Sequence, residues 1–114
     1  MIFVTGAFYA GKRNCIRTLL GLSEEEFARE AVWDVQELAE YGKAEAIADR
    51  LADKRVVIAT EIGCGVIPVS AAEREKREAA GQLACALAAR ADTVIRVCCG
   101  IPQLLKGEWP CASC

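Results

Sequence analysis

The sequence predicts a small three-layer α/β domain in which helices cover both faces of a mostly parallel sheet of about four strands. Four short apolar runs alternate with segments of helical periodicity, which is the order that builds a parallel sheet. A glycine-rich stretch joins the first run to the first helical segment. The 114 residues are enough for one domain with a real core. The expected strands are residues 2–5, 31–34, 55–60 and 93–99.

The glycine-rich stretch has the spacing of a phosphate-binding loop, G-x-x-x-x-G-K. Glycines at both ends let several backbone N–H groups converge on an anion, and Lys12 would add a full charge for the β- and γ-phosphates. The alternative is an ordinary strand-to-helix turn that contains two glycines. We expect a P-loop NTPase-like domain that binds ATP or GTP. The expected nucleotide-binding residues are Gly6, Ala7, Phe8, Tyr9, Ala10, Gly11, Lys12 and Arg13.

The end of this motif departs from the usual pattern, because Arg13 stands where a Ser or Thr hydroxyl would bind Mg²⁺. Mg²⁺ is therefore expected to lack its usual hydroxyl ligand. Asp34 follows the second apolar run and has two interpretations. It can reach Mg²⁺, usually through water, or it can cap the next helix with Glu37 three residues later.

The remaining elements follow from periodicity and capping residues. A helix is expected over 12–20, and Ser23 begins another helix through a capping box with Glu26. A broken helix is expected between residues 35 and 51, and a long helix from Ser70 to about residue 90. The β-branched run 55–60 should lie centrally in the sheet, and the loop after it lies where open α/β sheets place their ligands.

Composition excludes several classes of function. The net charge of −2 gives no basic surface for nucleic acid or anionic membranes, and no apolar run is long enough to span a bilayer. The chain has no histidine, which excludes His as base, metal ligand or covalent carrier. The seven cysteines are odd in number and no signal peptide precedes them, so we expect a cytoplasmic protein.

The cysteines near the end allow two interpretations. Cys111 and Cys114 form a C-x-x-C pair that Cys98 and Cys99 could complete to four thiolates for zinc. Adjacent cysteines are awkward ligands, and a redox C-x-x-C normally opens a helix. Free thiols are therefore favoured over a zinc site. We expect a P-loop α/β domain over 1–107 and a cysteine-containing tail over 108–114.

Three stretches of the second half carry a family resemblance. T-E-I-G-C-G-V-I-P at 60–68 resembles N-E-V-G-x-G-I-V-P of the CobU family, the adenosylcobinamide kinase/adenosylcobinamide-phosphate guanylyltransferases. R-E-A-A-G at 77–81 resembles R-D-x-x-G, and L-A-A-R-A-D at 87–92 resembles L-A-A-x-A-D. These three matches keep one register without gaps, and together with the loop 6–12 the likeness covers about half the chain.

The resemblance implies a P-loop kinase that phosphorylates the aminopropanol hydroxyl of adenosylcobinamide with a nucleoside triphosphate. The family then transfers GMP through a guanylylated histidine, which this chain lacks. Lys12 and Asp34 would be the catalytic residues, with Asp34 also on the metal side. The expected residues near the corrinoid substrate are Glu61, Gly63 and Gly65.

Besides Arg13, four positions differ from the family pattern. Phe8 and Tyr9 replace small or polar residues, and Ala84 and Cys85 replace Asn and Gln. These departures keep a second hypothesis open: a catalytically degenerate subunit that binds a nucleotide or another anion in a regulatory or structural role. A trimmed sheet leaves edges or apolar helix faces exposed, so a homo-oligomer is expected.

Overall fold

The structure is a computed structural model that describes residues 1–7, 10–62 and 70–110. A single five-stranded sheet has the order β2-β3-β1-β4-β5. Its strands are β1 (Ile2–Gly6), β2 (Ala31–Val32), β3 (Val56–Thr60), β4 (Thr93–Cys98) and β5 (Ile101–Lys106). The first four strands run parallel, and β5 pairs antiparallel with β4. The helices are α1 (Lys12–Leu20), α2 (Glu24–Glu30), the 3₁₀ helix η1 (Val35–Leu38), α3 (Ala44–Leu51) and α4 (Ala71–Arg90).

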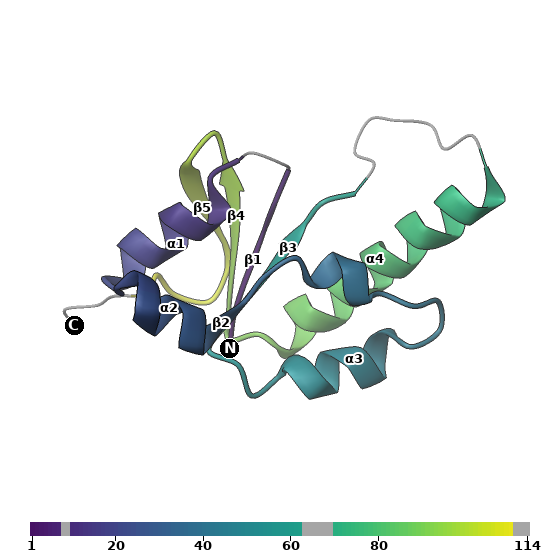
Figure 1. The fold of residues 1–114 in the computed structure, drawn as a ribbon, viewed down its shortest axis with the longest axis horizontal. Coiled ribbons are helices and arrows are strands. Elements are labelled where there is room, and N and C mark those ends of the chain that lie inside the picture. Colours follow the sequence, from purple (N-terminus) through teal and green to yellow (C-terminus); the bar gives the residue numbers. More distant parts are fainter. Residues whose placement is uncertain (8–9, 63–69, 111–114) are drawn as a thin grey trace.

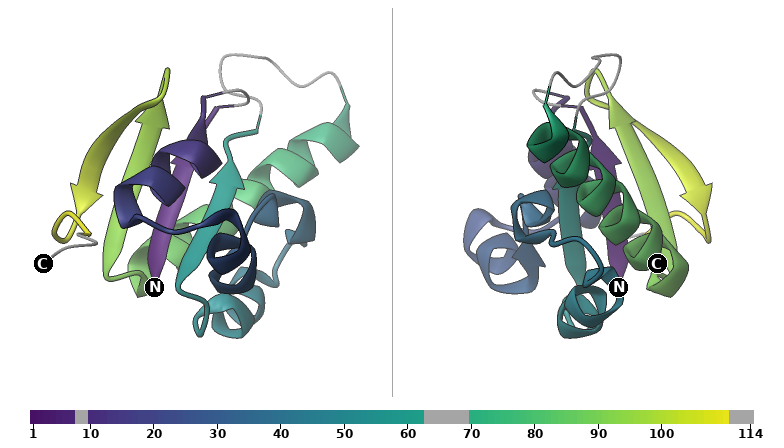
Figure 2. Two further views of the ribbon diagram at one scale, coloured as in Figure 1. Left: turned by 60° about the vertical axis from the view of Figure 1, so that its left-hand side comes forward. Right: turned by 90° about the vertical axis from the view of Figure 1, so that its right-hand side faces the viewer.

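The helices form two layers with the sheet between them. Helices α1 and α2 cover one face, and η1, α3 and α4 cover the other (Figures 1 and 2). Adjacent residues of the central strand serve opposite faces, because Phe3 packs toward the α4 layer and Val4 toward the α1 layer. The α/β, P-loop NTPase-like fold predicted from the sequence is confirmed.

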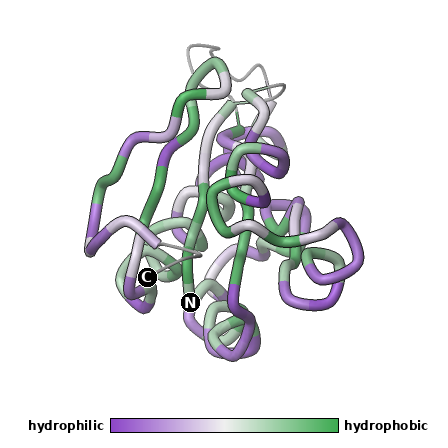
Figure 3. The backbone as a smooth tube through the Cα atoms, turned by 90° about the vertical axis from the view of Figure 1, so that its left-hand side faces the viewer, coloured by the Kyte–Doolittle hydropathy of each residue, from purple (hydrophilic) through white to green (hydrophobic). Residues whose placement is uncertain are grey.

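The buried strands are apolar on both sides, as expected for parallel strands covered by two helical layers. All five residues of β3 are buried, which confirms its predicted interior position. Figure 3 shows hydrophobic strands inside the molecule and hydrophilic segments on the outer helices and along the edge strand β5. Leu83 and Leu87 of α4 are almost completely buried against the sheet. The exposed first half of α4 extends beyond the sheet (Figure 1).

Local signals placed most helix ends correctly. Helix α1 spans the predicted residues and ends at Gly21, whose φ of 68° is in the left-handed region that glycine favours. The Ser23 hydroxyl accepts from the Glu26 N–H, and the Glu26 carboxylate accepts from the Ser23 N–H, so the predicted capping box is present. The Ser70 hydroxyl likewise accepts from the Glu73 N–H at the start of α4.

The predicted number of strands was too low, because β5 follows β4 in a tight hairpin. Cys99 and Gly100 form the connection with φ values of 51° and 74°. Two successive positive φ values belong to the turn type that matches the twist of a hairpin. β5 contains Pro102 and lies at the sheet edge, where proline is tolerated. The predicted strand 31–34 is also shorter, since β2 ends at Val32.

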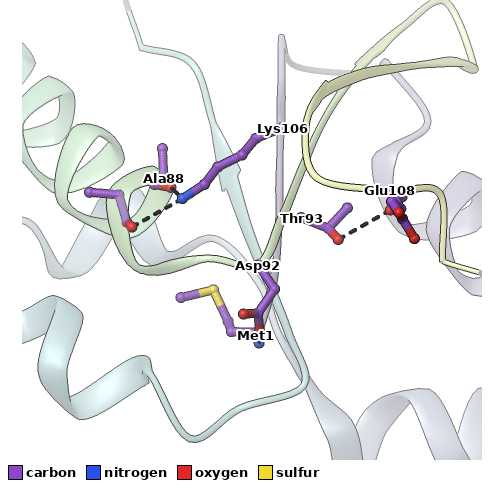
Figure 4. Close-up of polar contacts among 7 residues, drawn as sticks. Met1, Ala88, Asp92, Thr93, Lys106 and Glu108 are labelled. Atoms are coloured by element: carbon purple, nitrogen blue, oxygen red, sulfur yellow. Dashed lines mark hydrogen bonds and ion pairs between the residues drawn. The ribbon is translucent and has the colours of Figure 1, made fainter.

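The end of β5 is tied to neighbouring elements (Figure 4). The Lys106 ammonium donates to the carbonyl oxygens of Ala88 and Ala89, at 2.9 and 3.1 Å, and so caps the last turn of α4. The Thr93 hydroxyl donates to the Glu108 carbonyl oxygen at 3.2 Å.

No helix in the described part of the chain is long and apolar enough to cross a membrane. The division into residues 1–107 and a tail remains a prediction.

Candidate nucleotide-binding site

The predicted phosphate loop lies at the carboxyl end of the central strand β1, where parallel α/β sheets bind ligands. Gly11 precedes α1 with a φ of 81°, in the left-handed region. Gly6 ends β1, and a Cβ atom there would lie 2.5 Å from the Val97 carbonyl oxygen. Both glycines are therefore required by the backbone: Gly11 by its conformation and Gly6 by the close approach of β4.

The β4–β5 turn supports this loop from the other side. The Gly100 N–H donates to the Ala10 carbonyl oxygen at 2.7 Å. A Cβ atom on Gly11 would lie 3.5 Å from the Gly100 Cα atom, so the two backbones are in contact. The hairpin that was not predicted is thus part of the loop's support. The Cys99-Gly100 pair, a residue followed by glycine between two apolar runs, was the signal that could have revealed it.

Lys12 begins α1 and is buried, with a relative exposure of 9%. Its ammonium donates to the Ala7 carbonyl oxygen at 2.6 Å. Burial lowers the pKa of Lys12 from its ordinary value, although Asp34 and Glu61 act in the opposite direction and Arg13 adds to the lowering. A helix N-terminus also disfavours a cation. The site therefore places a buried cation at a helix N-terminus, where a phosphate would be stabilised.

Arg13 points toward an aromatic pair. The central carbon of its guanidinium lies over the Trp33 ring, 5.2 Å from the ring centroid. Trp33 in turn stacks on Phe27, with centroids 5.9 Å apart and planes 6° from parallel. A cation–π contact of this kind at an exposed site is worth about 0.5–1 kcal/mol. The sequence indicated that Arg13 replaces a hydroxyl but gave no sign of its aromatic partner.

Asp34 is exposed and lines a cavity of about 520 Å³ that also touches Lys12, Arg13 and Thr60. Asp34 has a φ of 57° and occupies the position before η1, but its side chain makes no capping hydrogen bond. The interpretation of Asp34 as a side-chain N-cap is therefore wrong. The backbone at this position forms the turn, which leaves the carboxylate at the cavity beside the phosphate loop.

Gln36 is a structural residue of the site that sequence reasoning missed. It is buried, and its side-chain oxygen accepts from the Thr60 N–H at 2.9 Å. Because β2 pairs with β3 only as far as Val57, the Thr60 N–H lies beyond the strand pairing on that side. Gln36 supplies the acceptor that a longer β2 would have supplied. The end of β3 therefore keeps its position beside the loop.

Glu61 follows β3 and is joined to Arg96 of β4 by two hydrogen bonds of 2.8 and 3.1 Å. Its N–H donates to the Gly6 carbonyl oxygen at 2.9 Å, so this residue also fixes the end of β1. The hydrogen bond from Arg96 holds the pKa of Glu61 below its usual value. Four other residues predicted for the site, Phe8, Tyr9, Gly63 and Gly65, lie outside the described residues.

Glu61→Gln is expected to lower the free energy of unfolding at pH 7 by about 0.5–1 kcal/mol, a value reduced for the partial exposure of the pair. The pKa of Glu61 is lower in the folded state than in the unfolded chain, where it is near 4.5. The ionised carboxylate therefore stabilises the fold at pH values above 4.5. This stabilisation is lost as pH falls through the pKa of the folded state. Urea unfolding at several pH values should therefore show that the difference in free energy of unfolding between the wild type and Glu61→Gln becomes smaller at acidic pH.

Glu40→Gln is the matched control for this measurement. Glu40 also pairs with a cation, Lys43 at 2.9 Å, but both side chains are exposed. This variant should unfold like the wild type at pH 7. An effect of Glu61→Gln that was independent of pH would contradict the assigned ion pair.

Arg13 changes the set of ligands that the motif offers to Mg²⁺. The hydroxyl position of the motif is occupied by the Arg13 guanidinium, which is a cation and has no lone pair to offer. Across residues 1–7, 10–62 and 70–110, no three His, Cys, Asp or Glu side chains form a group that could hold a metal ion. Cys98 and Cys99 are exposed free thiols, and Cys111 and Cys114 lie outside the described residues.

The family model described as cobinamide kinase / cobinamide phosphate guanyltransferase, CobU, matches residues 15–105. This match covers most of the chain. The chain belongs to the CobU family. A search of curated proteins finds no match.

Membership in the CobU family agrees with the α/β fold and with the resemblance found in residues 60–92. It supports a nucleotide-binding function of the kinase or transferase type, connected with cobinamide and hence with cobalamin biosynthesis. The matched region begins at Cys15, after the phosphate loop. The assignment of residues 6–13 to nucleotide binding therefore rests on the motif and on the geometry described above.

Proposed function

We propose that this CobU-family chain binds the phosphates of ATP or GTP at residues 6–13 and transfers the γ-phosphoryl group to the hydroxyl of a cobinamide-type corrinoid. The observation that carries the proposal is the buried Lys12 ammonium at the N-terminus of α1. A lysine placed there is unfavourable without an anion and favourable with one. Phosphoryl transfer depends mostly on positioning and electrostatics, which such a loop can provide.

The residues have separate roles in this proposal. Lys12 and the loop N–H groups would hold the triphosphate, and Asp34, which lines the same cavity, would hold Mg²⁺ through water. We propose that Mg²⁺ arrives with the nucleoside triphosphate as part of the substrate. When bound, the metal neutralises charge on the phosphates. Glu61, Gly63 and Gly65 are proposed to lie on the corrinoid side.

A second candidate function is a degenerate subunit that binds a nucleotide or another anion without turnover. Two observations favour it. Arg13 stands at the position of the metal-binding hydroxyl, and Glu61, proposed for the corrinoid side, is already hydrogen-bonded to Arg96. Incubation with γ-labelled ATP or GTP, Mg²⁺ and adenosylcobinamide separates the two functions. Labelled cobinamide phosphate is expected from the wild type and not from Lys12→Met. Nucleotide binding without product would favour the degenerate subunit.

No covalent GMP adduct of the histidine type is expected on this chain, because it contains no histidine. Intact-mass spectrometry after incubation with GTP should show only the unmodified mass. A stable addition of one GMP would contradict this prediction and would indicate a different nucleophile, such as a lysine.

We also propose a homo-oligomer and a cytoplasmic location. Large apolar side chains are exposed in two regions, with Leu38 and Tyr41 around η1, and Ile101, Leu105 and Trp109 on and after β5. Such side chains are typical of surfaces that another subunit covers. Light scattering should give a mass of at least two chains. A monomeric mass of 12.3 kDa would contradict the oligomer.

A further inference from the structure

We propose that Arg13 is a second phosphate-binding cation of this site and that Trp33 is its positioning residue. The ligand would be the diphosphate group of a nucleotide, bound by Lys12 and Arg13 together without a metal ion contributed by the protein. This inference rests on the proposed nucleotide site and adds to it the means by which charge is neutralised. It follows from Arg13, which replaces the hydroxyl residue of the motif, and from its contact with the Trp33 ring.

The position of Arg13 points to this role. It occupies the first turn of α1 beside Lys12, at the motif position whose side chain normally faces the metal. Arg13 also lines the 520 Å³ cavity together with Lys12 and Asp34. Arg13 is therefore placed to contact an anion bound in that cavity.

The contact with Trp33 leaves the hydrogen-bonding edge of Arg13 available. Stacking uses the flat face of a guanidinium, whereas its five N–H donors lie in the plane. Within the described part of the chain, no hydrogen bond or ion pair engages those donors. Arg17 lines the same cavity but already donates to the Leu22 carbonyl oxygen and to the Asn14 side chain. Arg13 is thus better placed than Arg17 to bind an anion.

Trp33 is itself held in place. It stacks on Phe27, and Phe27 is buried with a relative exposure of 5%. We call Phe27 and Trp33 the aromatic shelf. Because the shelf fixes the guanidinium face before any ligand arrives, less side-chain freedom is lost when the N–H edge binds phosphate. Trp33 therefore acts through Arg13 and needs no contact with the ligand.

Adjacent charges explain why an anion is expected. Arg13 contributes to the lowered pKa of Lys12, and both cations lie at a helix N-terminus. The two charges repel each other and the helix end until an anion lies between them. A diphosphate carries several oxygens that can accept from both side chains at once. Either a nucleotide or free pyrophosphate offers this chemistry.

The test is calorimetric titration in EDTA with sodium pyrophosphate and, separately, with GDP. The control Arg50→Gln changes an exposed arginine of α3 on the other face of the sheet. It should bind each ligand with the same affinity as the wild type. Arg13→Gln should bind both at least tenfold more weakly. Arg13→Lys should be intermediate because it keeps the charge without the planar fork. Trp33→Leu should bind both ligands several-fold more weakly than the wild type, and Trp33→Phe should keep most of the wild-type affinity.

A spectroscopic measurement keeps the role of Trp33 testable if Trp33→Leu does not fold. Trp33 and Trp109 are the two tryptophans of the chain, so Trp109→Phe leaves Trp33 emission alone. Pyrophosphate should change this emission, and the change should vanish when Arg13→Gln is added. Binding of pyrophosphate with unchanged Trp33 emission would overturn the positioning role.

The outcomes for the two proposals are distinct. Equal affinities of Arg13→Gln and wild type would overturn the inference and leave the proposed nucleotide site intact. If GDP binds while pyrophosphate does not, the base or ribose supplies the affinity, and a diphosphate site is contradicted. If wild type binds no nucleotide in EDTA or in Mg²⁺, the proposed function fails and the inference fails with it.

Discussion

Lys12→Met is expected to abolish most nucleotide binding while leaving the free energy of unfolding unchanged or higher. The loss of a charged hydrogen-bond donor to phosphate costs roughly 2–3 kcal/mol, which is a decrease in affinity of about 30- to 150-fold. Stability should not fall in parallel, because the substitution removes a cation whose pKa is lowered by burial. Methionine fills similar space without requiring hydration or a partner.

The pH dependence of stability gives an independent check on Lys12. Its folded pKa lies below the ordinary value of 10.5, so in the interval between them the unfolded chain binds more protons than the folded one. Wild-type stability attributable to Lys12 should therefore rise with pH through that interval, and Lys12→Met should lack this rise. Urea unfolding between pH 7 and roughly pH 10 measures it.

Lys76→Met is the matched control, since Lys76 lies on the exposed first half of α4. It should bind nucleotide like the wild type. A Lys12→Met variant that bound GDP normally would refute the proposed loop. One that unfolded far more readily than the wild type would show instead that Lys12 stabilises the fold through its bond to Ala7.

Gly107→Ala is expected to have the largest effect on stability, about 3 kcal/mol or more. Gly107 has a φ of 77°, and a Cβ atom there would collide with the backbone carbonyl oxygen of Asp92 and approach the Thr93 hydroxyl to 3.1 Å. The backbone at the start of β4 and at the end of β5 would have to shift. The hydrogen bond from Thr93 to Glu108 should also be lost.

Gly42→Ala separates the collision from the backbone conformation. Gly42 has nearly the same φ, 78°, but no atom lies within 4 Å of the Cβ position. Its cost should be only that of a left-handed alanine, about 1 kcal/mol. Urea unfolding of both variants measures the difference. Equal losses for Gly42→Ala and Gly107→Ala would show that the contact with Asp92 does not restrict this turn.

Features that depend on neighbours in the chain were predictable. The β-branched run 55–60 indicated an interior strand, and the Ser23 and Ser70 caps indicated where two helices begin. The glycine spacing at Gly6 and Gly11 predicted a loop between β1 and α1, because backbone freedom is a local property of glycine. The absence of histidine was equally visible.

Tertiary structure alone decided which distant side chains meet. Arg13 was visible as a departure from the motif, but its stacking on Trp33 depends on where the end of β2 lies relative to α1. The pairing of Glu61 with Arg96 depends on β1 lying between β3 and β4. The bond from Thr60 to Gln36 depends on how short β2 is. Periodicity along a chain specifies which face of an element is apolar, whereas strand order specifies which polar groups come within reach.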